Sequence, residues 1–113
     1  MNCYIDGGAE LEIGNNVGVG PGTVISTRGH EYKDPKVPIF EQPVSYGKII
    51  IGDDVAIGAN CFIHPGTIIG QGSFISAGAI ISGIIPPYSI VVGNPGRVIA
   101  NRIKKAEAEF ANR

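Results

Sequence analysis

An aliphatic side chain recurs at every sixth position through most of this chain. The series runs through Ile13, Val19 and Ile25, and it resumes from Ile51 to Ile81 without a slip. The next residue is usually Gly, and the residue four positions on is mostly small or β-branched. In an α-helix, residues six positions apart do not lie on one face. In a strand, positions i and i+4 share one face. The period therefore predicts short strands separated by turns.

Three hexads, or about 18 residues, would close one triangular coil whose strands stack on the next coil in parallel. We expect the aliphatic side chains to stack along the axis, and the recurring Gly to mark corners with unusual dihedral angles. A β-sandwich also has short strands, but irregular spacings separate them. The period favours an all-β fold, a parallel β-helix. It does not give the hand of the coils, since parallel crossovers are generally right-handed.

The inward aliphatic side chains are few for a thin solenoid of this length. Burying the flat outer faces against further copies of the chain would supply the missing apolar area. We therefore expect an oligomer.

The chain divides into a β-helix domain over residues 1–97, with a loop at 31–48, and a C-terminal helix over 98–113. The repeat character starts at the first residues without a cap, so we expect that upstream residues are missing. The helix is expected to pack beside the last coils and to cover the sheet edge. Its apolar side would carry Ile99, Ile103, Ala106 and Phe110.

Composition limits the classes of function. The net charge of −1 and the pI of about 6.1 give no electrostatic footprint for nucleic acid. Gly, Pro or a charge interrupts every apolar run, so no membrane span is expected, and a cytoplasmic location is the default. Cys3 and Cys61 lack the spacing of a metal site, and Cys61 is expected to be a packed thiol. His64 falls at a corner and is expected to face solvent without a catalytic or metal role.

The repeat is interrupted between Ile25 and Ile51, which are 26 positions apart, and 26 is not a multiple of six. A proline-rich loop from Glu31 to Lys48 must leave the solenoid there, and repeat proteins gather functional insertions on such loops. His30 stands where the last regular hexad ends. His30 therefore marks the position at which the loop departs from the repeats. Imidazole, with a pKa of about 6.5, is suited to accept a proton at neutral pH.

The chain resembles the hexapeptide-repeat acyltransferases, especially sugar O-acetyltransferases of the galactoside, maltose and capsular-polysaccharide kind. The resemblance implies a left-handed β-helix that works as a homotrimer. It implies transfer of an acetyl group from acetyl-CoA to a sugar or polysaccharide-precursor hydroxyl between subunits, with His30 as the general base and no metal. The matching segments are S-T-R-G-H at 26–30, I-G-D-D-V-A-I-G-A-N at 51–60, I-H-P-G-T-I-I-G at 63–70 and I-S-A-G-A-I-I-S-G-I-I-P-P-Y-S-I-V-V-G-N-P-G-R-V-I at 75–99.

The resemblance also implies where acetyl-CoA binds. The backbone at Ala59 and, one coil later, at Ala77 would contact the pantetheine arm. A backbone N–H near Ala59 would stabilise the oxyanion formed from the thioester. Ser82 would lie near the nucleotide, and Arg97 would bind its phosphates.

Two departures from the family pattern lie close to these positions. The Lys that follows the Ser82 position in relatives is Gly83 here, and a nearby cation is expected to replace its charge: Arg102, Lys104 or Lys105. The Trp that commonly precedes I-G in relatives is Ala56 here. This leaves a smaller side chain near the cleft between two subunits, in which relatives bind the pantetheine arm.

The acceptor side is less defined. The acceptor-binding Asn of relatives would fall before Met1, and Asn2 and Asp6 are the nearest polar candidates. Glu31 and Tyr32, and also Asp34, could line the acceptor pocket or orient His30.

Three other functions compete with sugar O-acetylation. A γ-class carbonic anhydrase needs three zinc-binding histidines, and this chain has two. An amine or an antibiotic hydroxyl could be the acceptor instead of a sugar, which the loop Glu31–Lys48 would decide. A non-catalytic, truncated solenoid is the third alternative. The S-T-R-G-H segment, the loop and the closing G-N-P-G-R-V-I favour the enzyme.

Overall fold

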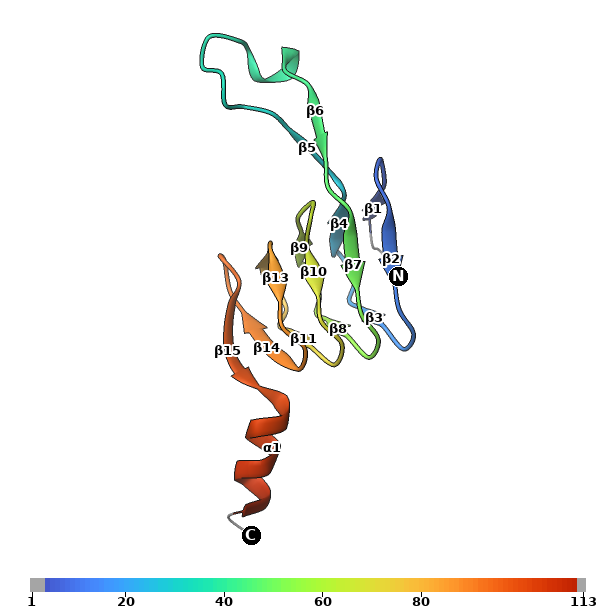
Figure 1. Ribbon diagram of the computed structural model, residues 1–113, viewed down its shortest axis with the longest axis vertical. Coiled ribbons are helices and arrows are strands. Elements are labelled where there is room, and N and C mark those ends of the chain that lie inside the picture. The colour runs from blue at the N-terminus through green and yellow to red at the C-terminus, as the bar shows by residue number, and fades with distance from the viewer. Residues whose placement is uncertain (1–3, 112–113) are drawn as a thin grey trace.

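The computed structural model describes residues 4–111, whose short strands wind into four stacked coils (Figure 1). The first coil holds β1 (Tyr4–Asp6), β2 (Leu11–Ile13) and β3 (Gly18–Val19). The second holds β4 (Val24–Ser26), β7 (Ile49–Ile51) and β8 (Ala56–Ile57). The third holds β9 (Phe62–Ile63), β10 (Ile68–Ile69) and β11 (Phe74–Ile75). The fourth holds β12 (Ile80–Ile81), β13 (Ile84–Ile85) and β14 (Ser89–Val92).

Each coil contributes one strand to each of three parallel sheets. Sheet A is β1-β4-β9-β12, sheet B is β2-β7-β10-β13, and sheet C is β3-β8-β11-β14 with one further strand. The chain runs from A to B to C in every coil, so the sheets meet at three edges, here called A–B, B–C and C–A. This confirms the predicted all-β architecture of stacked triangular coils.

The aliphatic residues of the six-residue period are direct neighbours between coils and form the core. Ile25 pairs with Ile63 in sheet A, and Ile57 pairs with Ile75 in sheet C. The residues four positions after the aliphatics also face inward and are buried: Thr23, Val55, Cys61, Thr67, Ser73 and Ala79. Side chains of the first coil stay more exposed, with Ile13 at 43%. A coil on one side alone covers them.

The glycines that follow the aliphatic residues do not make the corners, and our expectation for them is wrong. Gly58 is not among the residues with positive φ, but a Cβ on it would lie 2.5 Å from the backbone nitrogen of Ala77 in the next coil. These glycines are needed because neighbouring coils approach closely. The left-handed turns come three residues after the aliphatics, at Asn16, Gly22, Asp54, Asn60, Gly66, Gly72 and Gly78.

The excursion after β4 is an antiparallel hairpin that projects from the A–B edge, well clear of the prism (Figure 1). Its arms are β5 (Arg28–His30) and β6 (Val44–Tyr46), and a 3₁₀ turn, η1 (Ile39–Glu41), lies near its tip. The Gly47 N–H donates to the Thr27 carbonyl and closes the base, with an N–O distance of 2.8 Å. The excursion thus starts before the expected Glu31, and His30 lies on its first arm rather than on a hexad.

The C-terminal segment differs from our expectation of a helix over 98–113. Residues Arg97–Asn101 form β15, which pairs antiparallel with β14, and the helix α1 spans Arg102–Ala111. Residues 112 and 113 of the expected helix lie outside the described part. The strand, not the helix, covers the free edge of β14, because that edge offers unpaired backbone groups. The Asn101 side chain caps α1 by accepting from the N–H groups of Ile103 and Lys104 at 3.0 and 3.1 Å.

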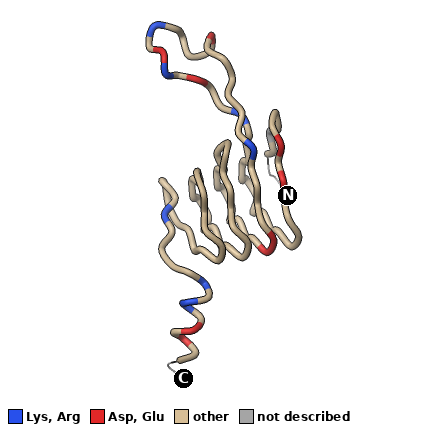
Figure 2. Tube along the Cα trace, in the orientation of Figure 1, with Lys and Arg blue, Asp and Glu red and all other residues tan. Residues whose placement is uncertain are grey.

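Charged residues lie mainly on the hairpin, the first coils and α1, and the middle coils carry few (Figure 2). Among residues 4–111, no helix is both long and apolar enough to cross a membrane.

Candidate active site

His30 lies at the end of β5, where it is the last residue paired with β6. Its backbone partner is Val44, and the side chain is exposed. The imidazole meets the ring of Phe40 edge to face, with centroids 5.1 Å apart and planes at 87°. The hairpin therefore carries its histidine outward, away from the buried core.

Two further predicted residues follow sheet A on the same A–B edge. His64 comes after β9 and Ser82 after β12, and both side chains are exposed. The His64 ring contacts Phe62 at a centroid distance of 4.8 Å. Its place at an exposed corner agrees with the sequence prediction.

The residues predicted for the pantetheine arm lie on a different edge, C–A. Ala59 follows β8 and Ala77 follows β11, in adjacent coils, and the Gly78 N–H donates to the Ala59 carbonyl at 2.8 Å. Within residues 4–111 the N–H groups of Ala59 and Ala77 have no acceptor. Arg97, at the start of β15, is exposed and pairs with Val92 at the end of β14, near this same edge. One protomer thus holds Ala59, Ala77 and Arg97 together and keeps them apart from His30 and Ser82.

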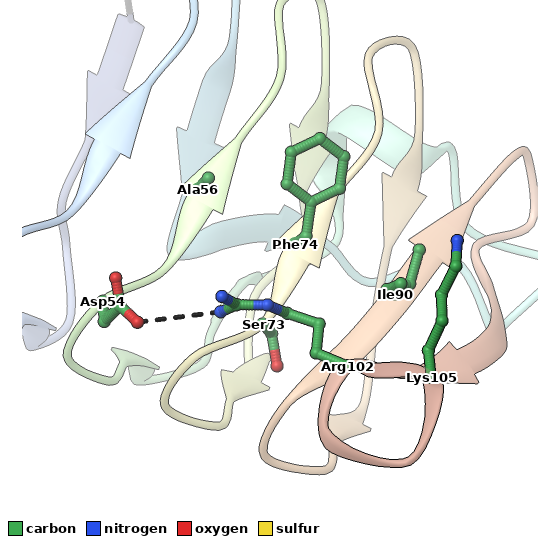
Figure 3. Close-up of a pocket in the computed structure, with 7 residues that line it drawn as sticks. All are labelled: Asp54, Ala56, Ser73, Phe74, Ile90, Arg102 and Lys105. Atoms are coloured by element: carbon green, nitrogen blue, oxygen red, sulfur yellow. Dashed lines mark ion pairs between the residues drawn. The ribbon is translucent and has the colours of Figure 1, made fainter. Parts of the chain in front are cut away.

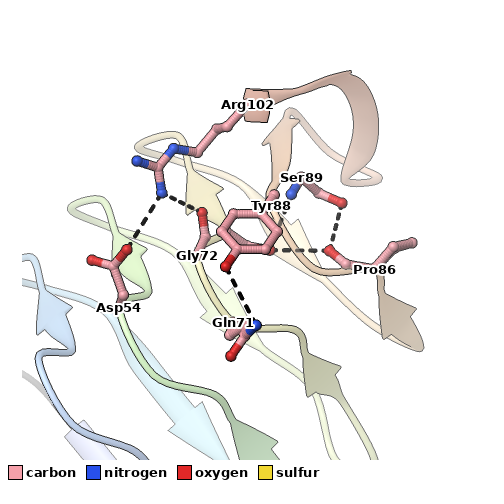
Figure 4. Close-up of polar contacts among 8 residues, drawn as sticks. Asp54, Gln71, Gly72, Pro86, Tyr88, Ser89 and Arg102 are labelled. Atoms are coloured by element: carbon pink, nitrogen blue, oxygen red, sulfur yellow. Dashed lines mark hydrogen bonds and ion pairs between the residues drawn. The ribbon is translucent and has the colours of Figure 1, made fainter. Parts of the chain in front are cut away.

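Arg102 lies at the third edge, B–C, where it is already engaged (Figure 4). Its guanidinium pairs with Asp54 at 3.6 Å and donates to the Gly72 carbonyl. Its backbone N–H donates to the Tyr88 carbonyl at 2.7 Å. Arg102 therefore anchors the start of α1, and this geometry does not favour it as the replacement for the missing Lys beside Ser82.

A pocket of about 460 Å³ opens on the outer face of sheet C beside α1 (Figure 3). The strand register stacks Ala56, Phe74 and Ile90 in one outward column that forms its apolar wall. Lys105 of α1 lines the pocket from the helix side, and the remaining lining residues are Asp54, Ser73 and Arg102. Sequence reasoning noted the small side chain of Ala56 but missed the pocket, because α1 completes it.

The predicted acceptor residues lie partly on the hairpin. Glu31 is half-buried, and its N–H donates to the Pro43 carbonyl at 3.1 Å, while Tyr32 is 71% exposed. The backbone of Asp6 pairs with Ser26 in sheet A, and Asn2 lies outside the described residues. Asp34 accepts from the Lys36 N–H at 2.9 Å in a local turn. Glu31 and Tyr32 thus follow His30 directly after β5, and Asp34 lies further along the same loop.

Cys61 is buried, and its thiol donates to the Ser76 carbonyl at an S–O distance of 3.2 Å. This agrees with the predicted packed thiol. Within residues 4–111 there is no cluster of three or more His, Cys, Asp or Glu side chains that could hold a metal ion.

Comparison with known proteins shows that the chain is similar to acetyltransferases. Residues 48–83 match the family model for the hexapeptide repeat of succinyl-transferase. A probable acetyltransferase of Mycobacterium tuberculosis is 35% identical over 113 residues, which are 100% of this chain and 36% of that protein.

Two solved structures superpose on the chain. A galactoside acetyltransferase in complex with coenzyme A has a TM-score of 0.84 and 32% identity, over 94% of this chain and 52% of that one. A hexapeptide-repeat acetyltransferase of Vibrio cholerae complexed with acetyl-CoA has a TM-score of 0.82 and 32% identity, over 89% of this chain and 54% of that one. The chain spans about half the length of these proteins, or less. It is nevertheless related to the hexapeptide-repeat acetyltransferases in sequence and in fold.

Proposed function

We propose that this chain transfers an acetyl group from acetyl-CoA to a hydroxyl of a sugar or polysaccharide precursor, with His30 as the general base. The proposal includes a homotrimer of left-handed coils, with each active site between two subunits. Its support is the relation to acetyltransferases that were solved with coenzyme A or acetyl-CoA. Because the chain spans about half of those proteins, the activity of the whole protein is part of the proposal.

The separation of the candidate residues between two edges is the observation that carries the proposal. His30 projects from the A–B edge, whereas Ala59 and Ala77 lie on the C–A edge of the same prism. Residues on two edges of one triangular prism can meet when a second copy sets its A–B edge beside the first copy's C–A edge. A cyclic trimer repeats that contact three times.

The proposed reaction uses His30 to remove the proton of the acceptor hydroxyl as its oxygen attacks the thioester carbonyl carbon. The tetrahedral intermediate carries an oxyanion, which a backbone N–H at Ala59 would stabilise. When the carbon–sulfur bond breaks, the proton on the imidazole passes to the sulfur of coenzyme A. The products are the acetyl ester and free coenzyme A, and the imidazole returns to its starting state. General base catalysis of this kind contributes about 10²–10⁴ in rate.

The C–A edge has the features that the pantetheine arm would require. The N–H groups of Ala59 and Ala77 have no acceptor within the described chain, whereas Gly58, Asn60 and Gly78 donate to neighbouring coils. Small side chains leave this backbone accessible to the amide groups of pantetheine. Arg97, near the same edge, would pair with the phosphates.

A thiol-release assay with acetyl-CoA and a panel of sugar, amine and antibiotic acceptors tests the reaction. We expect turnover with a sugar hydroxyl, and a loss of about 10²-fold or more in kcat for His30→Ala. His64→Ala is the matched control, since His64 is also an exposed histidine on the A–B edge. Turnover that survives in His30→Ala would refute the role of His30. If release of coenzyme A requires an amine, the acceptor is an amine and not a hydroxyl.

A mixing experiment tests whether two subunits share the site. His30→Ala removes the base, and Ala77→Trp is expected to block the donor groove, so each variant alone should be inactive. Co-expressed, the two variants should form some mixed sites with both functions intact and regain part of the activity. Light scattering after size exclusion should give the mass of a trimer. A monomer, or mixed trimers without recovered activity, would contradict a shared site.

A further inference from the structure

We infer that Phe40 is a positioning residue that fixes the orientation of the His30 imidazole, and that a clamp formed by the Gln42 side chain holds Phe40 in place. The inference rests on the proposed function, in which His30 is the base. The hairpin stands clear of the prism, so contacts within the hairpin would have to hold the His30 ring in a single orientation.

The hairpin backbone fixes the main chain of His30 but leaves its ring free to rotate. Pairing of β5 with β6 ends at His30 and Val44, and the Glu31 N–H adds one more bond to the Pro43 carbonyl. The prism lies away from this end of the hairpin (Figure 1). An exposed side chain can adopt several staggered rotamers. Selection of one orientation must therefore come from the hairpin itself or from a neighbouring copy.

Gln42 holds the loop beyond β5 in a closed shape. It is buried, which no other side chain between Arg28 and Lys48 is. Its amide nitrogen donates to the backbone carbonyls of Asp34 at 3.0 Å and Val37 at 2.8 Å. One side chain thereby satisfies two carbonyl groups from the outgoing half of the loop, and it ties them to the returning half.

The closed loop brings Phe40 against His30. Phe40 is the middle residue of η1, whose turn is closed by bonds from Glu41 N–H to the Pro38 carbonyl and from Gln42 N–H to the Ile39 carbonyl. The edge-to-face geometry with His30 is a preferred arrangement for two rings. Phe40 is otherwise 86% exposed, so its packing within the described chain is mainly this contact. An aromatic ring placed in solvent against the candidate base is better explained by orientation of the base than by stability of the fold.

Orientation matters because a general base must lie within hydrogen-bond reach of the proton it removes. A displacement of about 1 Å can lower the rate about 10²-fold. Rotation of the His30 side chain about its first torsion would move the ring by more than this. A contact that restricts the ring should therefore affect kcat more than the binding of acetyl-CoA.

The test uses Phe40→Leu, which keeps an apolar side chain but removes the ring, and Phe40→Tyr, which keeps the ring. Ile39→Ala is the matched control, since Ile39 is an exposed apolar neighbour in the same turn. We expect kcat to fall roughly tenfold in Phe40→Leu, with the KM for acetyl-CoA unchanged, and to stay within roughly twofold in Phe40→Tyr and Ile39→Ala. The imidazole proton resonances of His30 should shift in Phe40→Leu and not in Ile39→Ala. In Gln42→Glu, a carboxylate faces the two carbonyls, and the resonances should shift in the same direction as in Phe40→Leu.

The outcomes separate this inference from the proposed function. If Phe40→Leu leaves both kcat and the His30 resonances as they are in Ile39→Ala, the positioning role is wrong even when His30→Ala is inactive. If His30→Ala stays active, the function of His30 is wrong, and the resonances alone decide whether Phe40 orients the ring. Unchanged amide resonances of the prism show that each variant remains folded.

Discussion

Substitution of Gly58 by Ala should destabilise the solenoid although the backbone at Gly58 suits any residue. Gly58 follows the aliphatic Ile57 and is not among the residues with positive φ, so alanine meets no dihedral penalty there. The obstacle is the next coil. An added Cβ would lie 2.5 Å from the Ala77 nitrogen and 2.7 Å from the Ala77 Cα.

The magnitude follows from the distance by which the coils must separate. Ordinary van der Waals contact begins at 3.4 Å, so the gap must open by about 0.9 Å at this point. Two bonds flank it, from Gly58 N–H to the Ile75 carbonyl and from Gly78 N–H to the Ala59 carbonyl, each at 2.8 Å. Stretching both costs about 0.5–1.5 kcal/mol each, and overpacking adds about 1–3 kcal/mol. We expect Gly58→Ala to lower the free energy of unfolding by about 2–6 kcal/mol.

Gly78 provides the contrasting case. Its φ is +77°, and a Cβ on it would meet no atom within 4 Å. Gly78→Ala should therefore cost about 1–2 kcal/mol from the left-handed conformation alone. Gly78→Asn should recover much of that loss, since Asn60 adopts a φ of 56° at the same corner one coil earlier.

Denaturant unfolding followed by far-UV circular dichroism measures these differences, with all variants at one protein concentration because association shifts the midpoint. From the most to the least stable, the expected order is wild type, Gly78→Asn, Gly78→Ala and Gly58→Ala. If Gly58→Ala is as stable as Gly78→Ala or more stable, close approach between coils is not the reason for the recurring glycine.

Three other predictions concern stability at particular contacts. Thr67→Val should cost about 1–3 kcal/mol in denaturant unfolding, because the Thr67 hydroxyl donates its one hydrogen to the His64 carbonyl at 2.7 Å, with the Ile81 carbonyl also near at 3.3 Å. Hydrogen bonding and the charge of Lys48 lower the pKa of Glu10, while hydrogen bonding to Glu10 and then to Glu12 raises the pKa of Lys48. The pair therefore stabilises at neutral pH and is lost as pH falls through the folded-state pKa of Glu10 or rises through that of Lys48, so the difference in midpoint between wild type and Lys48→Met should vanish at both extremes. Arg102→Gln should lower the helical circular dichroism signal, because it removes the hydrogen bond to the Gly72 carbonyl and the ion pair with Asp54 that hold the start of α1. The exposed ion pair by itself is worth about 0–1 kcal/mol.

The candidate site was only partly predictable from the sequence. The position of His30 could be found because the six-residue period fails there, whereas its role as a base comes from the family resemblance. The placement of Arg97 beside Ala59 and Ala77, and of Arg102 at another edge, depends on β15 turning back along β14. The apolar spacing of Ile99 and Ile103 is typical of a helix. Ile99 nevertheless lies in β15, because this segment pairs with β14, and the six-residue period does not predict that pairing.

The period alone determined which side chains face the axis and which follow one another from coil to coil. This is a local property, since a strand alternates its faces whatever surrounds it. The tertiary structure decided what depends on contacts between distant residues. Those contacts give the glycines their role in close approach, the C-terminal strand its edge, and the Gln42 amide its place between two halves of a loop. The physical reason is that backbone groups bond whichever partner the fold brings within reach, and a single sequence does not name that partner.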